Sequence, residues 1–292
     1  MCIIFGDAIA SKTLGYVGET TRNTNVFIYQ NNVKVVGDDD IPRVMMLHVP
    51  TTGKITLHDT SDYNLFVEEL KTEYESRLPK TRGLSKSVPS SNDDLSFEIQ
   101  QVGIYTCIIA DSPSVINDAI KTLDESLQVE ISDEMLKIYE ETFPSWKIVL
   151  ALFKNKKEQK SQPFLVEYES FIVDNSDNGN KTPLLFFPAL DNDSGSGIHS
   201  GIPNLKCDIE RDHYIISGFQ TLQKHINSYK VNIYDTNDFK FSQNIPTWLM
   251  PKYVTGEKLN YVVENSDILI MSETKEVIDI NNHFGLTIKE FS

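Results

Sequence analysis

The sequence predicts an α+β fold built largely from antiparallel sheets, and three observations support it. Short runs rich in Ile, Val, Phe and Tyr, separated by Gly, Asn, Asp and Pro, recur along the chain and are typical of strands. Apolar residues at helical spacing occur in only about three segments. Strands and helices also do not alternate regularly, as a doubly wound nucleotide-binding fold requires. We therefore expect two packed sheets flanked by about three helices.

The expected strands are short and follow the apolar runs. They are Cys2–Phe5, Asn25–Gln30, Arg43–Val49, Lys54–His58, Leu95–Val102, Ile104–Ala110, Trp146–Phe153, Phe164–Tyr168, Leu184–Phe187, Tyr214–Ser217, Lys230–Tyr234, Tyr261–Glu264 and Ile268–Met271. The glycine-bearing segment Gly15–Thr21 lacks the Gly-Lys-Ser/Thr ending of a phosphate-binding loop, and we expect a turn there.

Three helices are expected from apolar periodicity and capping residues. The first covers Asp62–Arg77, where apolar residues recur at helical spacing. The second begins with Ser112 as its cap and Pro113 at the first helical position. The third is capped by Ser132 and ends at Pro144.

The length of 292 residues fits one α+β domain spanning residues 1–292. Residues 79–94 are almost free of apolar side chains and predict a flexible loop. A duplication into halves 1–78 and 95–292 is one reading, because a Cys-Ile-Ile run and a pair of apolar strands occur in both halves. Chance recurrence of common apolar strands is the other reading.

Composition argues against several classes of partner and compartment. The net charge is −15, from 42 acidic and 27 basic residues, and such a surface repels nucleic-acid phosphates and anionic membranes. Three scattered cysteines form neither a disulfide framework nor a zinc-binding spacing. No apolar run is long enough to span a membrane, and the N-terminus lacks signal-peptide features. We expect a soluble cytoplasmic protein without a cofactor or a bound metal.

Two acidic segments resemble calcium-binding loops but do not complete the pattern. Asp191–His199 has Ser196 at the sixth position and Ile202 at the twelfth, where an EF-hand requires Gly and Glu. Asp174–Gly179 fails at its twelfth position, which is Leu185. Both segments are better interpreted as exposed turns.

The cysteine that follows the initiator methionine raises the sharpest chemical hypothesis. Removal of Met1 leaves Cys2 with a thiol and a free α-amine, and that amine can act as the base that activates the thiol. The alternative is that Cys2 packs as a small apolar residue in the first strand.

The opening Cys2-Ile3-Ile4-Phe5-Gly6 resembles the Met-Cys-Gly-Ile-Phe-Gly opening of N-terminal-nucleophile glutamine amidotransferases. Arg22-Asn23-Thr24-Asn25 is similar to the Arg and Asp that follow the cysteine in choloylglycine hydrolases of the same superfamily. The resemblance implies a two-sheet sandwich between helices, in which Cys2 attacks an amide while Arg22 with Asn23 or Asn25 positions the substrate. Ile3 replaces a glycine and Asn25 an aspartate of those patterns, and the segments that grip glutamine are missing.

A longer resemblance runs from Cys2 through the segments RVMMLHVP and LLFFPALD. It is similar to an uncharacterised family of proteins that begin Met-Cys. Because no activity is assigned to that family, this resemblance implies a fold and no chemistry.

Other nucleophiles and bases are scattered along the chain. His48 and His58 lie at strand ends, and His58 is followed by Asp59, a carboxylate that could orient an imidazole toward a cysteine. Cys107 falls inside an apolar strand and is expected in the core, whereas Cys207 lies among charges near the surface.

Two functions therefore remain open. In the first, the protein is non-catalytic and binds a protein partner or a small-molecule ligand through a β surface and loops such as 191–201. In the alternative, it is a cysteine N-terminal-nucleophile amidohydrolase that uses Cys2, Arg22 and Asn25. The absence of a complete catalytic motif favours the first.

Overall fold

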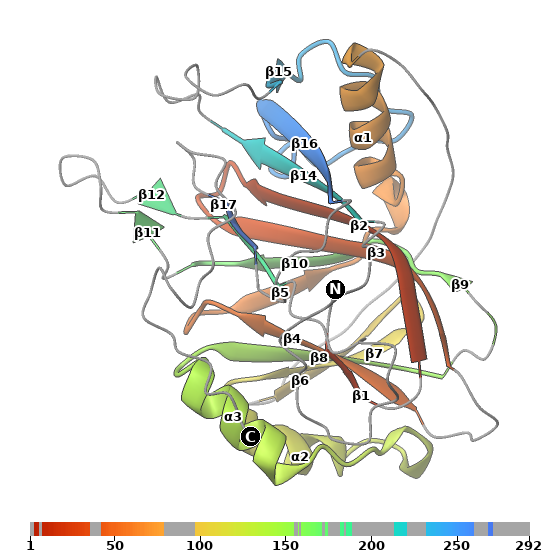
Figure 1. The fold of residues 1–292 in the computed structure, drawn as a ribbon, viewed down its shortest axis with the longest axis vertical. Helices are drawn as coiled ribbons and strands as arrows, with labels where there is room; N and C mark the ends of the chain where they lie inside the picture. The colour runs from red at the N-terminus through yellow and green to blue at the C-terminus, as the bar shows by residue number, and fades with distance from the viewer. Residues whose placement is uncertain are drawn as a thin grey trace.

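The computed structural model describes residues 3–5, 8–35, 42–78, 97–154, 157, 159–170, 173–174, 182–183, 185–188, 213–220, 232–259 and 268–270. Two large sheets dominate these residues (Figure 1). The five-stranded sheet is antiparallel throughout. Its order is β1 (Ile3–Phe5), β4 (Arg43–Val49), β8 (Lys147–Phe153), β7 (Tyr105–Ala110) and β6 (Phe97–Val102).

The eight-stranded sheet is antiparallel except where β14 runs parallel to β2. Its order is β15 (Tyr234–Asp235), β16 (Tyr253–Leu259), β14 (His213–Phe219), β2 (Ala8–Glu19), β3 (Asn25–Val35), β10 (Phe164–Tyr168) and β5 (Ile55–His58), with β9 (Gln159–Lys160) also paired to β3. Two small sheets pair β11 (Val173–Asp174) with β12 (Thr182–Pro183) and β13 (Leu185–Phe187) with β17 (Ile268–Ile270).

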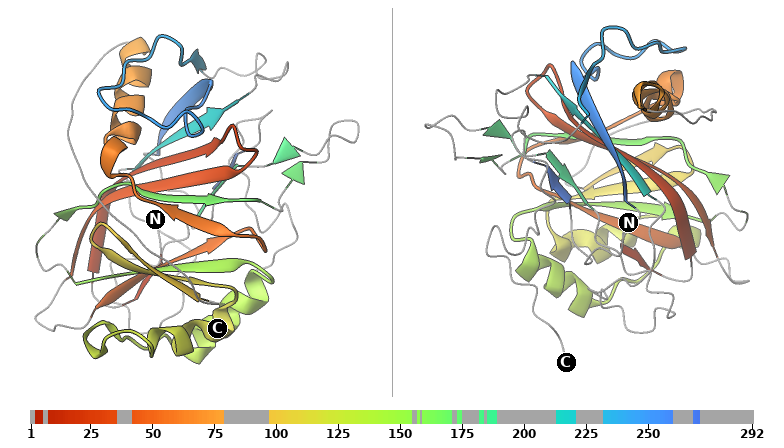
Figure 2. Two further views of the ribbon diagram at one scale, coloured as in Figure 1. Left: turned by 180° about the vertical axis from the view of Figure 1, so that it is seen from behind. Right: turned by 45° about the horizontal axis from the view of Figure 1, so that its top comes forward.

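Helices cover the outer face of each large sheet. Helix α1 (Phe66–Arg77) packs on the eight-stranded sheet through a cluster that includes Phe66 and Leu70. Helices α2 (Ile116–Ile120) and α3 (Asp133–Thr142) pack on the five-stranded sheet. Short 3-10 turns are η1 (Ser61–Tyr63), η2 (Pro113–Val115) and η3 (Glu125–Leu127). The layers therefore run from α1 through the two sheets to α2 and α3 (Figure 2).

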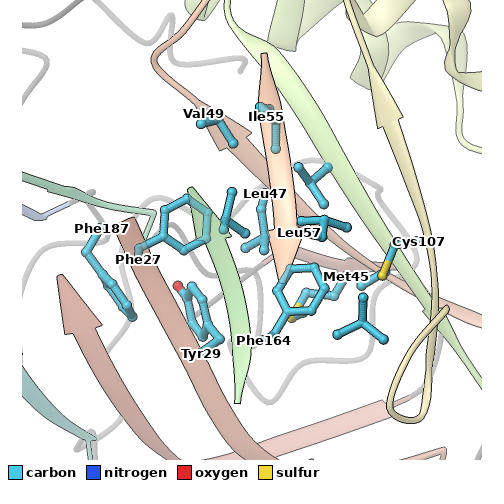
Figure 3. Packing of buried hydrophobic residues seen from close by; sticks show 14 of the residues in the cluster. Phe27, Tyr29, Met45, Leu47, Val49, Ile55, Leu57, Cys107, Phe164 and Phe187 are labelled. Atoms are coloured by element: carbon cyan, nitrogen blue, oxygen red, sulfur yellow. The ribbon is translucent and has the colours of Figure 1, made fainter. Parts of the chain in front are cut away.

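Alternation along the strands produces this layering, because successive side chains of a strand point to opposite faces. In β8, Val149 and Ala151 enter the core between the sheets, whereas Ile148 and Leu150 face α2 and α3. Strands of the eight-stranded sheet obey the same rule, and their inward side chains meet those of β4 and β7 (Figure 3). The expected α+β class, with two packed, mainly antiparallel sheets flanked by helices, is confirmed.

Strand β2 corrects the expectation of a turn at Gly15–Thr21, because residues up to Glu19 belong to the strand. Its glycines serve packing. A Cβ at Gly18 would lie 2.2 Å from the Tyr16 hydroxyl, and one at Gly218, its partner on β14, would lie 2.3 Å from the same atom. These two glycines leave the space that the fully buried Tyr16 ring fills.

Helix capping was predicted correctly at one of two serines. Ser132 Oγ accepts a hydrogen bond from Met135 N, and α3 ends at Thr142, just before Pro144. Ser112 instead bonds to Ser114, and its side chain caps nothing. A 3-10 turn therefore precedes α2.

The first helix also begins later than expected, at Phe66. Residues 61–63 form the separate 3-10 turn η1 before it. Among the described residues, no helix combines the length and the apolar character needed to cross a lipid bilayer.

Several expectations fall outside the described residues. They are the loop at 79–94, the turn at Asp191–His199, most of Asp174–Gly179, the strand Tyr261–Glu264, and Cys207. The single-domain organisation and the duplication of halves 1–78 and 95–292 stay predictions.

Candidate functional site

The Glu167 carboxylate, on the outer face of the eight-stranded sheet, contacts several polar side chains. Glu167 Oε2 lies 2.6 Å from His58 Nε2 and 3.2 Å from Arg22 Nη1. The Thr24 hydroxyl donates to Glu167 Oε1 over 2.6 Å. Trp248 packs against both His58 and Arg22. We call these five residues the Glu167 cluster.

Strand pairing brings Glu167 and His58 together. His58 on β5 lies opposite Leu165 of β10, so Glu167, two residues farther along, is its diagonal neighbour on the same face. Leu165 belongs to the cluster under α1, which places this face on the outside of the sandwich. The pair therefore lies away from the core between the sheets.

The turn between β2 and β3 positions Arg22. Thr20 O accepts a bond from Asn23 N, and Asn23 adopts a left-handed backbone with φ of 60°, which asparagine tolerates well. The Thr20 hydroxyl oxygen accepts from the backbone N–H groups of Arg22 and Thr24. These bonds fix the turn, and with it the direction in which the Arg22 side chain leaves the backbone.

Trp248 closes the cluster from the segment before β16. Its carbonyl accepts from Thr21 N, which joins this segment to the turn. The Arg22 guanidinium carbon lies 4.2 Å from the centre of the indole ring, within the range of a cation–π contact. The His58 ring lies 4.7 Å from the same indole at a tilt of 38°.

The electrostatics favour a charged carboxylate. Burial raises the pKa of Glu167, but the hydrogen bonds from His58 and Thr24 and the charges of His58 and Arg22 outweigh it, so that this pKa falls below its ordinary value. The Glu167 side chain is 9% exposed, whereas that of Arg22 is 49% exposed. The cluster thus holds a buried negative charge beneath a cation that half faces solvent.

Sequence-predicted site residues have different surroundings. Arg22 belongs to the Glu167 cluster. Asn25 begins β3, is buried, and bonds through its side chain to Tyr168. Cys2 lies outside the described residues. The proposed roles of Cys2, Arg22 and Asn25 in an amidohydrolase therefore stay predictions.

The histidines correct the expected His–carboxylate pairing. His58 pairs with Glu167, and the neighbouring Asp59 instead accepts from Ser61 N through Oδ1. The reason is geometric: His58 and Asp59 are consecutive at the end of β5, where side chains alternate between faces. His48 is buried in β4, with its ring stacked 4.0 Å from that of Phe143.

Sequence reasoning missed Glu167 and Trp248. A signal for Glu167 existed, since alternation in the strand Phe164–Tyr168 places Leu165 and Glu167 on the face opposite the inward Phe164 and Val166. The partner strand that carries His58 lies more than a hundred residues away, and its register is not readable from either strand alone. Trp248 lies in a segment without regular structure, where no periodic pattern marks it.

Two polar groups of the Glu167 cluster, His58 and Thr24, face the same carboxylate. These contacts do not aim the His58 ring nitrogen at the Thr24 hydroxyl. Catalysis by a base–nucleophile pair requires the two groups to face each other. The accessible element of the cluster is the Arg22 guanidinium against the Trp248 ring.

No known protein family matches the chain, and no curated protein matches it in sequence. Solved structures of baculovirus P35 are similar in fold. One crystal structure of P35 has 14% identity and a TM-score of 0.49, and the match covers 92% of this chain and 98% of that chain. A mutated P35 after caspase cleavage has 12% identity and a TM-score of 0.45, covering 89% and 99% of the two chains. The caspase-8/P35 complex gives 13% identity and a TM-score of 0.42, covering 90% and 95%.

Proposed function

We propose that this is a non-catalytic interaction protein that binds a protein partner through the Arg22–Trp248 side of the Glu167 cluster. One observation carries the proposal. The Arg22 guanidinium is held by the Glu167 carboxylate on one side and the Trp248 ring on another, yet its side chain is still 49% exposed. It is therefore both ordered and accessible.

A side chain that is already ordered in the free protein favours affinity, because less conformational entropy is lost on binding. An exposed arginine loses rotamer freedom when a partner immobilises it, at a cost of about 0.5–1.5 kcal/mol. The contacts of Arg22 with Glu167 and Trp248 meet part of that cost in the free protein. Arg and Trp are also the residue types enriched among the contacts that dominate protein interfaces.

The chemistry of the pair limits the partner. Arginine presents five N–H donors in a planar fork, and among the described contacts of Arg22 only Nη1 is bonded through its side chain, to Glu167. The remaining donors suit a carboxylate or backbone carbonyl on a partner. The Trp248 ring adds apolar area beside them. A protein surface with an acidic or carbonyl oxygen next to an apolar side chain satisfies both.

The test is affinity purification from a cell lysate with quantitative mass spectrometry. The baits are the wild-type protein, Arg22→Ala, and Lys137→Ala as the control. Lys137 is an exposed cation on α3, with its side chain 76% exposed, so the control removes the same charge away from the cluster. Purified caspase-8, the protein bound to P35 in one of the crystal structures above, is included as a defined probe. Thermal unfolding of each bait checks that the fold is kept.

We expect at least one protein to bind the wild type and Lys137→Ala equally and to lose about tenfold or more in affinity for Arg22→Ala, the size of effect that removal of a dominant interface contact produces. The proposal is overturned if every retained protein binds all three baits equally. It is also overturned if the purified protein turns over amide substrates and Cys2→Ser abolishes that turnover.

A further inference from the structure

Helices α2 and α3 lie on the opposite side of the sandwich from α1 (Figure 1). Residues of α2, of the segment 128–130 and of the start of α3 line a groove there. Its volume is about 590 Å³, comparable with sites that accept a short peptide or a small ligand. The apolar residues among its lining are Ile120 and Leu136, which are buried, and Val129, which is half-buried, and we call these three the floor. Its rim carries Asp118, Glu130 and Asp133, and Lys121 is the one cation among its lining residues.

Side-chain hydrogen bonds fix the segment that lines one side of the groove. Asn117 Nδ2 donates to the carbonyl of Ile131, and Ile131 N donates back to Asn117 Oδ1. Gln128 Nε2 donates to the carbonyls of Lys121 and Leu123. These bonds tie the segment 128–131 to α2 and to the turn that follows it, so the hollow is a feature of the folded protein.

The rim produces a negative potential in the groove. Lys121 Nζ lies 2.8 Å from Asp118 Oδ1. The hydrogen bond and charge of Asp118, together with the charges of Asp133 and Glu130, raise the pKa of Lys121. All three carboxylates therefore stabilise the positive charge of Lys121. Their three negative charges exceed the single positive charge of that lysine.

An apolar floor beneath an acidic rim matches the structure of a lysine or arginine side chain. Such a side chain has an aliphatic stem that prefers apolar surroundings and a charged head that prefers carboxylates and water. Lys121 shows that a lysine head is stabilised at the rim. The net charge of −15 adds long-range attraction for a basic partner.

We propose that this groove is a docking site for a lysine- or arginine-bearing segment of a partner protein. The stem of one basic residue lies on Ile120, Val129 and Leu136, and its head binds Glu130 and Asp118. The incoming cation competes with Lys121 for Asp118. The proposal concerns a surface separate from the Glu167 cluster and does not depend on the role of Arg22.

The probe is a fluorescein-labelled peptide of lysine, leucine and glycine, with a glutamate-for-lysine peptide as its control, and binding is followed by fluorescence anisotropy on the full chain. Asp118→Asn with Glu130→Gln removes two rim charges. Asp124→Asn with Glu125→Gln, called the η3 double variant, removes two equal charges at the start of η3 that do not line the groove. Lys121→Gln removes the competing cation.

We expect the rim double variant to weaken binding of the lysine peptide by about tenfold and the η3 double variant by less than about twofold. Lys121→Gln should tighten binding of the lysine peptide. The more negative net charge of this variant would also tighten binding, so this variant alone does not locate the site. The comparison of the two double variants separates the site from the net charge. Equal effects of those two variants, tighter binding of the glutamate peptide, or failure of the lysine peptide to bind the wild type would each overturn the proposal.

Discussion

Glu167 on β10 and His58 on β5 join two strands through a contact of 2.6 Å on the outer face of the sheet. Two further groups, Arg22 and Thr24, reach the same carboxylate from the β2–β3 turn. One buried charge therefore connects two strands, β5 and β10, to the β2–β3 turn. Because its neighbours hold the pKa of Glu167 below the ordinary value, this connection depends on pH.

Glu167 should make the protein less stable in acid. A carboxyl whose pKa is lower in the folded than in the unfolded state stabilises the fold above its unfolded pKa, about 4.3, and this stabilisation is lost as the pH falls through the folded pKa. Glu167→Gln removes the titration. We expect urea midpoints of the wild type to decrease more steeply than those of the variant between about pH 5 and pH 3. Parallel midpoints over this range would show that Glu167 does not contribute.

The space that Tyr16 fills should make Gly218 intolerant of any side chain. A Cβ at Gly218 would lie 2.3 Å from the Tyr16 hydroxyl and 2.7 Å from Pro251 Cβ. We expect Gly218→Ala to destabilise the protein by about 1–3 kcal/mol, the usual cost of overpacking. Gly53→Ala is the control, since its Cβ would meet only Thr51 Oγ1 at 3.4 Å.

The double variant Gly218→Ala with Tyr16→Phe tests the cause. The Tyr16 hydroxyl is buried, with no hydrogen-bond partner among the described residues, so removing it costs little by itself. We expect Tyr16→Phe to restore part of the stability that Gly218→Ala loses. Strictly additive losses in urea unfolding would assign the damage to Pro251 or to the backbone instead.

Two serines that precede helical segments should differ in their contribution to stability. Ser132 Oγ accepts from Met135 N, whereas Ser112 Oγ contacts only the exposed Ser114 hydroxyl among its described partners. We expect Ser132→Ala to lower the free energy of unfolding by about 1 kcal/mol. Ser112→Ala should change it by less than about 0.5 kcal/mol. Urea titrations of the two variants measure the difference, and equal losses would contradict the assigned capping roles.

Cys107 should resist alkylation until the protein unfolds. Its side chain has no exposed surface in the core between the sheets, and burial raises the pKa of its thiol well above the ordinary value. Brief treatment with iodoacetamide near neutral pH, followed by peptide mass spectrometry, should leave Cys107 unmodified in the native state and modified in urea. Labelling in the native state would show that the core opens on the time scale of the reaction.

The same measurement tests the hydrolase hypothesis. If Met1 is removed and Cys2 is labelled much faster than a cysteine in a denatured control, the N-terminal-nucleophile prediction gains support. If Met1 remains or Cys2 reacts at an ordinary rate, that prediction is wrong.

The fold class was readable from local patterns. Apolar runs placed β4 and β10 at their observed bounds, because strands that are buried on both faces carry apolar side chains at most consecutive positions and not only at alternate ones. Local patterns gave a wrong prediction where a glycine makes room for a side chain from elsewhere in the fold. Gly15 and Gly18 indicated a turn but lie in β2, where their missing side chains make room for Phe187 and Tyr16.

The sequence by itself determined the α+β class, most strands and the Ser132 cap, since each depends on residues close together along the chain. Only the tertiary structure decided which residues share a site. Arg22 and His58 were visible as candidates, but Glu167 and Trp248 join them through strand register and the packing of an irregular segment. Contacts between residues so distant in sequence depend on how whole elements fit together, and no local pattern encodes that fit.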